Sequence, residues 1–140
     1  MKIVFFGEDV KIPKFRRMTF KNVLRKLSTE KNLTKGDINY IFCSDKFLLT
    51  INRDFLNHDY FTDIVTFDYC EDNFISGDIY VSVDRVLDNS KIFGTNYENE
   101  LIRVMSHGFL HLLKYDDTEQ RDKIVMNNME ELCLKYYYEI

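Results

Sequence analysis

The chain has 140 residues, of which 45% are hydrophobic and 30% charged, and its formal net charge is −4 at pH 7. This size and composition suit one globular domain, residues 1–140, with a hydrophobic core, and they exclude an intrinsically disordered chain. The sequence has no run of about 18 apolar residues that would span a membrane, and its three widely separated cysteines suit the reducing conditions of the cytoplasm, where we expect the protein.

The first predicted elements are a strand over residues 2–6 and a helix over residues 15–30. Helical spacing gives this helix one apolar face, formed by Phe20, Val23, Leu24 and Leu27. Between Lys11 and Lys35, nine basic residues stand against one acid, Glu30. This basic segment could bind phosphates or could be an ordinary solvated helix face. Its candidate phosphate-binding residues, which would contact RNA if the substrate is a nucleic acid, are Arg16, Arg17, Lys21 and Arg25.

Three more strands, rich in Ile, Val, Phe and Tyr, are predicted over residues 38–43, 64–69 and 78–83. Ser44 is a candidate cap for a helix between the second and third strands, with an inward face of Phe47, Leu48, Ile51 and Phe55. The helical crossover favours parallel pairing of those two strands, whereas the short connection over residues 70–76 favours an antiparallel pair of the third and fourth strands. The predicted fold is α+β, with a mixed four-stranded sheet packed with helices.

The C-terminal half is predicted to form three helices, over residues 84–93, 97–113 and 118–138. Helical spacing gives the middle helix a core stripe of Leu101, Met105, Gly108 and Leu112, and an edge with Glu100, Arg103, His107 and His111. A glycine inside a helix costs up to about 1 kcal/mol relative to alanine. Gly108 therefore indicates that another segment packs close to this helix, and the fourth strand is the candidate.

The two histidines of the middle helix suggest a metal site. Residues four apart on a helix are neighbours, so His107 and His111 can direct two imidazole nitrogens at one ion of the size of zinc. A third ligand has to come from outside the helix, and Asp117 follows far enough along the chain for a turn back.

Other interpretations remain open for the third ligand. His58 is the alternative third ligand, and Asp116 could cap a helix or ligate. Asp117 also begins an Asp-Thr-Glu-Gln capping-box pattern, in which Gln120 would reach back at the start of the last helix.

The spacing of His107, His111 and Asp117 matches the frame H-E-x-x-H-x-x-G-x-x-H of the metzincin proteases. In that frame, the glutamate after the first histidine is the general base, and here the position is Gly108. Because glycine cannot accept a proton, peptide hydrolysis by that mechanism is excluded, and a zincin-like metal-binding helix remains.

The stretch HGFLHLLKYDD, residues 107–117, resembles the H-G-x-L-H-L-x-G-Y-D-H motif of the YbeY family of zinc-dependent endoribonucleases. FTDIVTF at residues 61–67 resembles the family's P-T-D-V-L-S-F strand, and SGDIYVSV at residues 76–83 resembles its G-D-I strand. Arg103 falls four residues before the first histidine, as the family's arginine often does. These motifs keep the family's order from about residue 52 to residue 132.

The resemblance implies a single-strand-specific, metal-dependent endoribonuclease that acts in rRNA processing and ribosome maturation. One Zn²⁺ per chain would be held by His107, His111 and Asp117, which are also the candidate catalytic residues, and metal-activated water would attack the phosphodiester. The implied partners are an rRNA precursor and the ribosome or its small subunit, with no membrane and no DNA.

Two further sets of residues are candidates for supporting roles. Asp63 and Asp78, at strand starts, are candidates to hydrogen-bond the second ring nitrogens of ligating histidines. Arg103 could contact phosphate or form an ion pair with Glu100.

Three residues depart from the family motifs. Asp117 replaces the third histidine, which lowers the net charge of the site and should weaken its Lewis acidity. Leu56 stands where the family has an arginine that could clamp phosphate, although His58 or Arg53 could substitute. Lys114 replaces a glycine at a helix end where a left-handed residue is common. The alternative function is therefore a non-catalytic RNA-binding or ribosome-binding maturation factor with a structural zinc.

Overall fold

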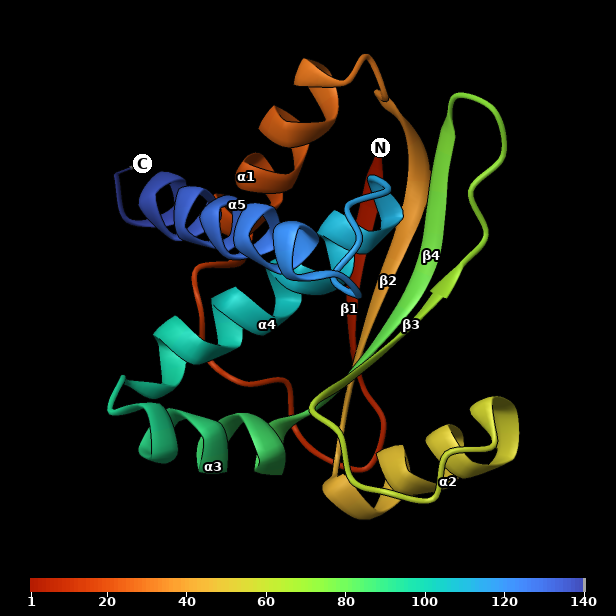
Figure 1. The fold of residues 1–140 in the computed structure, drawn as a ribbon, viewed down its shortest axis with the longest axis vertical. Helices are drawn as coiled ribbons and strands as arrows, with labels where there is room; N and C mark the ends of the chain where they lie inside the picture. Colours follow the sequence, from red (N-terminus) through yellow and green to blue (C-terminus); the bar gives the residue numbers. More distant parts are fainter. Residues whose placement is uncertain (140) are drawn as a thin grey trace.

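The computed structural model describes residues 1–139. In this range the chain forms four strands and five helices (Figure 1), in the order β1 (Lys2–Gly7), α1 (Arg17–Glu30), β2 (Lys35–Cys43), α2 (Asp45–Leu56), β3 (Ile64–Asp68), β4 (Phe74–Ser82), α3 (Val83–Phe93), α4 (Tyr97–Leu112) and α5 (Gln120–Glu139). Each element predicted from the sequence is present. The largest differences in their ends are at β4, which begins four residues earlier than predicted, and at β2, which begins three residues earlier.

The four strands form one mixed sheet in the order β1-β2-β4-β3. β1 is parallel to β2, β2 is parallel to β4, and β3 is antiparallel to β4. The predicted antiparallel pair of β3 and β4 is confirmed, but the predicted parallel pairing of β2 with β3 is wrong. β4 pairs with all nine residues of β2, from Lys35 opposite Phe74 to Cys43 opposite Ser82, and leaves the shorter β3 at the edge of the sheet.

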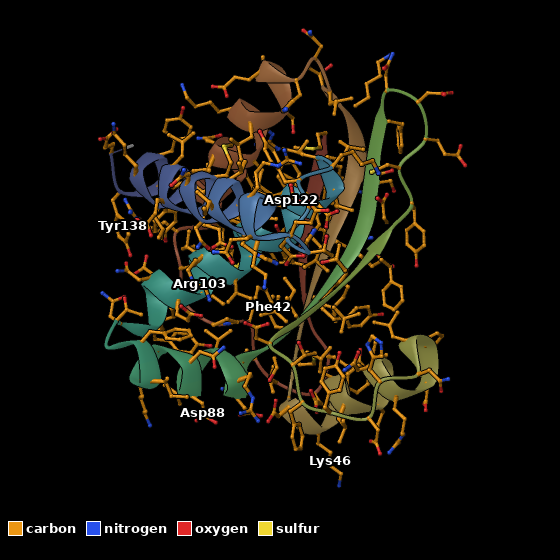
Figure 2. All side chains as sticks on the ribbon, viewed as in Figure 1. Phe42, Lys46, Asp88, Arg103, Asp122 and Tyr138 are labelled. Carbon is orange, nitrogen blue, oxygen red and sulfur yellow. The ribbon has the colours of Figure 1, made fainter. Side chains whose placement is uncertain are left out.

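Helices cover both faces of the sheet (Figure 1). Side chains of α1, α3, α4 and α5 pack against one face in the main core, and a smaller core joins α2 to the other face. The alternation of β4 shows the division, because Ile79 and Val81 lie in the main core whereas Tyr80 packs with the smaller core. In Figure 2, Phe42 lies between the sheet and the helices, and Lys46 and Asp88 lie at the outer margin of the molecule.

Helix α2 begins as predicted but buries less of its face. The Ser44 hydroxyl accepts a hydrogen bond from the backbone N–H of Phe47 at 3.1 Å, which confirms the predicted cap. Leu48 is fully buried, but Phe55 is 68% exposed, so the prediction that Phe55 points inward is wrong. Phe55 lies in the last turn of α2, outside the smaller core, where its ring makes an edge contact with the ring of Phe67.

Helix α4 lies close to the sheet because of Gly108. A Cβ atom at this position would come within 2.7 Å of Ile64 Cδ1 and 2.9 Å of Ile79 Cγ2. The predicted close approach is therefore confirmed, and its partners are side chains of β3 as well as β4. The predicted stripe of Leu101, Met105, Gly108 and Leu112 is buried, which leaves the adjacent edge of the helix for polar side chains.

Candidate metal centre

The last two turns of α4 and the chain that follows bring three potential metal ligands together. The Nε2 atoms of His107 and His111 lie 3.0 Å apart. Asp117 Oδ2 lies 3.3 Å from His107 Nε2 and 3.4 Å from His111 Nε2. Within residues 1–139, these side chains form the group of histidine, cysteine and carboxylate ligands whose donor atoms are close enough to share one ion.

The spacing of these donor atoms suits zinc. Zinc binds imidazole nitrogen at about 2.0–2.1 Å and is usually tetrahedral, so neighbouring ligand atoms lie about 3.3–3.4 Å apart. The three separations in this group, 3.0, 3.3 and 3.4 Å, are close to that value. Two histidines and a carboxylate also leave one position of a tetrahedral site open, as catalytic zinc sites do.

Hydrogen bonds orient both imidazole rings so that their Nε2 atoms are free. The Nδ1 atom of His111 donates to the backbone carbonyl of Tyr115 at 3.0 Å, and Nδ1 of His107 donates to Glu130 Oε2 at 2.6 Å. A carbonyl and a carboxylate can only accept, so the proton is placed on Nδ1 of each ring. Each Nε2 atom then presents its lone pair toward Asp117, the geometry that metal-ligating histidines require.

A tight turn after α4 returns the chain to the histidines. The N–H of Tyr115 donates to the carbonyl of Leu110, and the N–H of Lys114 donates to the carbonyl of His111, the two bonds of a Schellman motif. This motif needs a left-handed residue, and Lys114 occupies that position with φ of 74°. Lysine therefore keeps the turn that a glycine would form more easily, and Lys114 Nζ also pairs with Asp68 Oδ2 at 2.6 Å.

The turn places Asp117 beside the histidines and away from a capping position. Helix α5 begins at Gln120, so Glu119 is the residue before its first turn and Asp117 lies two residues further back. The capping-box interpretation of Asp117 and Gln120 is therefore wrong. Asp116 accepts a hydrogen bond from the backbone N–H of Asp117 at 2.8 Å, which helps to fix the turn.

Glu130 of α5 is the main residue of the site that sequence reasoning missed. Its side chain is buried, and its two oxygens accept from different residues: Oε2 from His107 and Oε1 from Arg103 Nη1 at 3.0 Å. Arg103, labelled in Figure 2, also donates from Nε to Glu100 Oε1 at 2.9 Å. A chain of charged groups thus runs from Glu100 through Arg103 and Glu130 to His107.

A signal for Glu130 was present in the sequence. The buried face of α5 consists of Met126, Glu130, Cys133 and Tyr137, so this glutamate lies on an apolar helical stripe. A charged residue on such a stripe is rarely buried without a partner. Identifying that partner required the packing of α5 on α4, which the sequence does not reveal.

Neighbouring carboxylates change the proton affinity of His107. Burial alone would lower the pKa of His107, but the hydrogen bond and charge of Glu130, with the charges of Asp117 and Asp63, raise that pKa above its ordinary value. In Asp63, burial raises the pKa of the carboxyl group, and the charges of Arg103 and His107 oppose this effect. Protons therefore compete with a metal ion at His107 over a wider pH range than at an exposed histidine.

The three potential ligands line a cleft of about 460 Å³. Its other walls come from β3, the end of α2 and the loop before β3, including Leu56, His58 and Tyr60. His58 therefore shares the cleft, but it is not one of the three residues whose donor atoms converge, and its Nδ1 lies 3.1 Å from the Tyr60 hydroxyl. No lysine or arginine in residues 1–139 is among the residues that line the cleft.

Asp63, Asp78 and Arg103 occupy different environments. Asp63 lines the cleft and accepts a hydrogen bond from Asn89 Nδ2 at 3.2 Å. Asp78 accepts from Asn39 Nδ2 at 3.0 Å, on the sheet face opposite Ile79 and α4, so the structure does not bring it to the histidines. The expected ion pair of Arg103 with Glu100 is present, and each guanidinium nitrogen donates to a buried carboxylate, that of Glu100 or of Glu130.

The residues of the basic segment lie outside the cleft. Arg16 is held by α5, because its guanidinium donates to the Tyr137 carbonyl at 2.9 Å and stacks over the Tyr137 ring. Arg17 is exposed, and Lys21 and Arg25 are half-buried on α1. Of these four candidates, Arg16 therefore has a clear structural role.

Comparisons with known proteins agree with this architecture. The sequence model of the family described as Endoribonuclease YbeY matches residues 3–138. Proteins named Endoribonuclease YbeY from Cytophaga hutchinsonii and Parabacteroides distasonis are 42% and 40% identical to the chain over 133 and 134 residues. These alignments cover 94% and 96% of the chain and 93% and 94% of the relatives.

A relative of the same name from Flavobacterium johnsoniae is 51% identical over 105 residues, which are 75% of this chain and 74% of that protein. The solution structure of a Thermotoga maritima protein superposes on this chain with a TM-score of 0.66 and 27% sequence identity. The superposition covers 98% of this chain and 89% of that protein. The fold, the order of the motifs and these matches agree, and the chain belongs to the Endoribonuclease YbeY family.

Proposed function

We propose that this protein is a single-strand-specific, metal-dependent endoribonuclease that takes part in rRNA maturation in the cytoplasm. The observation that carries the proposal is the convergence of His107 Nε2, His111 Nε2 and Asp117 Oδ2 in an open cleft. Membership of a family named for endoribonuclease activity supports RNA as the substrate. We further propose an rRNA precursor as that RNA and the small ribosomal subunit as the place of action.

The three converging residues would hold one Zn²⁺ ion. A bound zinc would lower the pKa of a water molecule and polarise a phosphoryl oxygen, so that the phosphodiester can be attacked. Glu130 and the Tyr115 carbonyl hold the two imidazole rings with their Nε2 lone pairs directed at the ion. Since Asp117 adds a negative charge where a third histidine would be neutral, the site should bind zinc well and activate phosphate less strongly.

One observation favours a second candidate function, a non-catalytic RNA-binding or ribosome-binding factor with a structural zinc. Leu56 lines the cleft where the family motif suggested an arginine, and Arg53 lies outside the cleft and pairs with Asp54. Within residues 1–139, no lysine or arginine lines the cleft, where a cation could stabilise charge that develops on a phosphate. In this alternative, the basic segment would supply the RNA affinity.

Comparing the wild type with His111→Ala distinguishes the two functions. The zinc-loaded wild type should cleave single-stranded RNA, and His111→Ala should abolish cleavage while the circular dichroism spectrum stays unchanged. Glu119→Ala, an exposed residue beside the site, is the matched control and should retain full activity. A wild type that binds RNA without cleaving it, together with a His111→Ala variant that unfolds more easily, would instead support the structural-zinc alternative.

A further inference from the structure

Two aromatic rings form a stack on the wall of the cleft. The rings of His58 and Tyr60 lie nearly parallel, 18° apart, with their centres separated by 5.2 Å. Both residues line the same cleft as His107 and His111. Tyr60 is nevertheless 56% exposed, so a large part of its surface remains available to a ligand.

The loop that carries these rings is held in place by a buried amide. Asn52, which is 2% exposed, donates from its side-chain Nδ2 to the backbone carbonyl of Tyr60 at 3.0 Å. The backbone carbonyl of Asn52 accepts from the N–H of His58 at 3.1 Å. Asn57 turns the chain out of α2 in a left-handed conformation with φ of 61°. A hydrogen bond between the Tyr60 hydroxyl and His58 Nδ1 then fixes the two rings relative to each other. The stack is therefore formed before any ligand arrives.

The charges around the cleft exclude a phosphate clamp made by the protein. Asp63, Asp68 and Asp117 contribute carboxylates to its lining. Lys114 pairs with Asp68 at 2.6 Å, but within residues 1–139 no lysine or arginine is itself among the lining residues. A phosphodiester entering this cleft would be repelled by Asp63 and Asp117 unless a metal ion were bound, and the nearby cation Lys114 is already paired with Asp68. Affinity for a nucleic acid at this point has to come from its bases, and an exposed aromatic ring offers the stacking surface that a base requires.

We propose that the His58 and Tyr60 stack is a binding site for one unpaired nucleobase of the RNA, next to the phosphodiester at the metal centre. This inference rests on the proposed function, because it assigns the substrate contact of that same cleft. A base inside a duplex is stacked on both of its faces and paired with its partner base, so it cannot reach the ring of Tyr60. The site thus selects single-stranded RNA by the availability of a free base and takes over the positioning that an arginine at residue 56 would otherwise provide.

Substitution of Tyr60 tests this binding site. Tyr60→Ala should raise KM for a short single-stranded RNA about tenfold, equivalent to about 1.4 kcal/mol, with kcat and zinc content little changed. Tyr60→Phe should restore KM, because the aromatic ring remains. Tyr69→Ala is the matched control, since Tyr69 is 55% exposed and lies outside the cleft, and it should leave KM unchanged.

An RNA with one abasic nucleotide beside the cleavage site makes the test specific for stacking. This RNA should bind the wild type as weakly as the complete RNA binds Tyr60→Ala, and combining both changes should cause no further loss. Affinities measured in the presence of a chelator separate binding from cleavage. RNA cleavage with an unchanged KM in Tyr60→Ala would overturn the stacking site and leave the proposed function intact. RNA binding that depends on Tyr60 without cleavage would contradict only the catalytic function, and a wild type with no RNA affinity would overturn both.

Discussion

The cleft at the end of α4 and the basic segment around α1 differ in almost every physical respect. The cleft is lined by carboxylates and imidazoles with no lysine or arginine of residues 1–139, whereas residues 11–35 contain nine basic side chains and one acid. Buried hydrogen bonds hold the cleft side chains, as in the contact of Glu130 with His107, while Arg17 on α1 is exposed to solvent. Under the proposed function, the chemistry and the general attraction of phosphates would belong to separate parts of one small fold.

This difference between the two regions predicts which substitutions have large effects on zinc binding and RNA binding. A buried, fully hydrogen-bonded charge cannot be removed without leaving its partners unsatisfied, so changes around the cleft should be costly. The charges of exposed side chains on a helix are screened by salt and act additively, so replacing any one of them should change RNA affinity only slightly. The predictions below test whether the two regions behave in these two ways.

The largest expected effect follows from Glu130→Gln. An amide at this position must turn its NH₂ group toward either Arg103 or His107, so one of the two hydrogen bonds is lost. We expect zinc affinity to fall about 10–100-fold, the range found when partners of metal-ligating histidines are removed. Competition with a chromophoric chelator measures the change, and Glu131→Gln, its exposed neighbour, is the control. Equal zinc affinities for Glu130→Gln and the wild type would show that Glu130 does not position the metal ligand.

The second largest effect is expected in the pH dependence of zinc binding. The pKa of His107 is raised in the folded protein, so protonation of this ring stabilises the metal-free fold. This stabilisation is fully present below about pH 6.5, the ordinary pKa of histidine. That contribution is lost as pH rises through the raised pKa, and zinc, which needs the neutral ring, binds progressively better over the same range. The increase in Tm caused by zinc should therefore grow between about pH 6 and 8. An increase that is the same at every pH would contradict the role of His107 as a ligand.

The smallest effect is expected in the basic segment. Replacing Arg17, Lys21 and Arg25 together by glutamine should weaken RNA binding several-fold at low salt and leave kcat at saturating RNA unchanged. If all three contact phosphates, the slope of log affinity against log salt should become shallower by about 2, since each contact to a single strand contributes about 0.7. An unchanged slope would show that the basic side chains of α1 form an ordinary solvated face that does not contact the RNA. Arg16 is left intact in this variant because its contacts with Tyr137 serve the fold.

Much of the fold follows from local sequence signals, and the exceptions involve long-range pairing. Hydrophobic periodicity located all the elements, and Gly108 correctly indicated a close approach to the sheet. The predicted pairing of β2 with β3 was wrong. A helical crossover favours parallel strands only if the two strands are neighbours, and β4 lies between β2 and β3. The prediction that Phe55 points into the core was wrong because helical spacing gives the direction of a side chain but not how far the opposing core extends.

For the candidate site, the sequence supplied the groups that lie close together along the chain. His107, His111 and Asp117 are separated by a helical repeat and one turn, and the structure brings their donor atoms together. Glu130 contacts His107 from α5, and Tyr60 lines the cleft from the loop before β3. Both depend on tertiary packing, so spacing alone did not connect them with the histidines. Asp78 was a candidate to support the histidines because it was expected at the start of its strand. β4 begins at Phe74, so Asp78 lies within the strand, whose alternation turns it to the opposite face.

The most direct test of the account is the zinc content of Asp117 variants, measured by mass spectrometry on protein purified without chelator and then loaded and dialysed. The wild type should hold about one zinc per chain, Asp117→Ala should lose it, and Asp117→His, which restores an imidazole, should keep it. His58→Ala should also keep its zinc, since His58 is not among the three converging side chains. Zinc retained by Asp117→Ala and lost from His58→Ala would contradict the proposed ligand set, and a wild type that holds no zinc would contradict the metal centre itself.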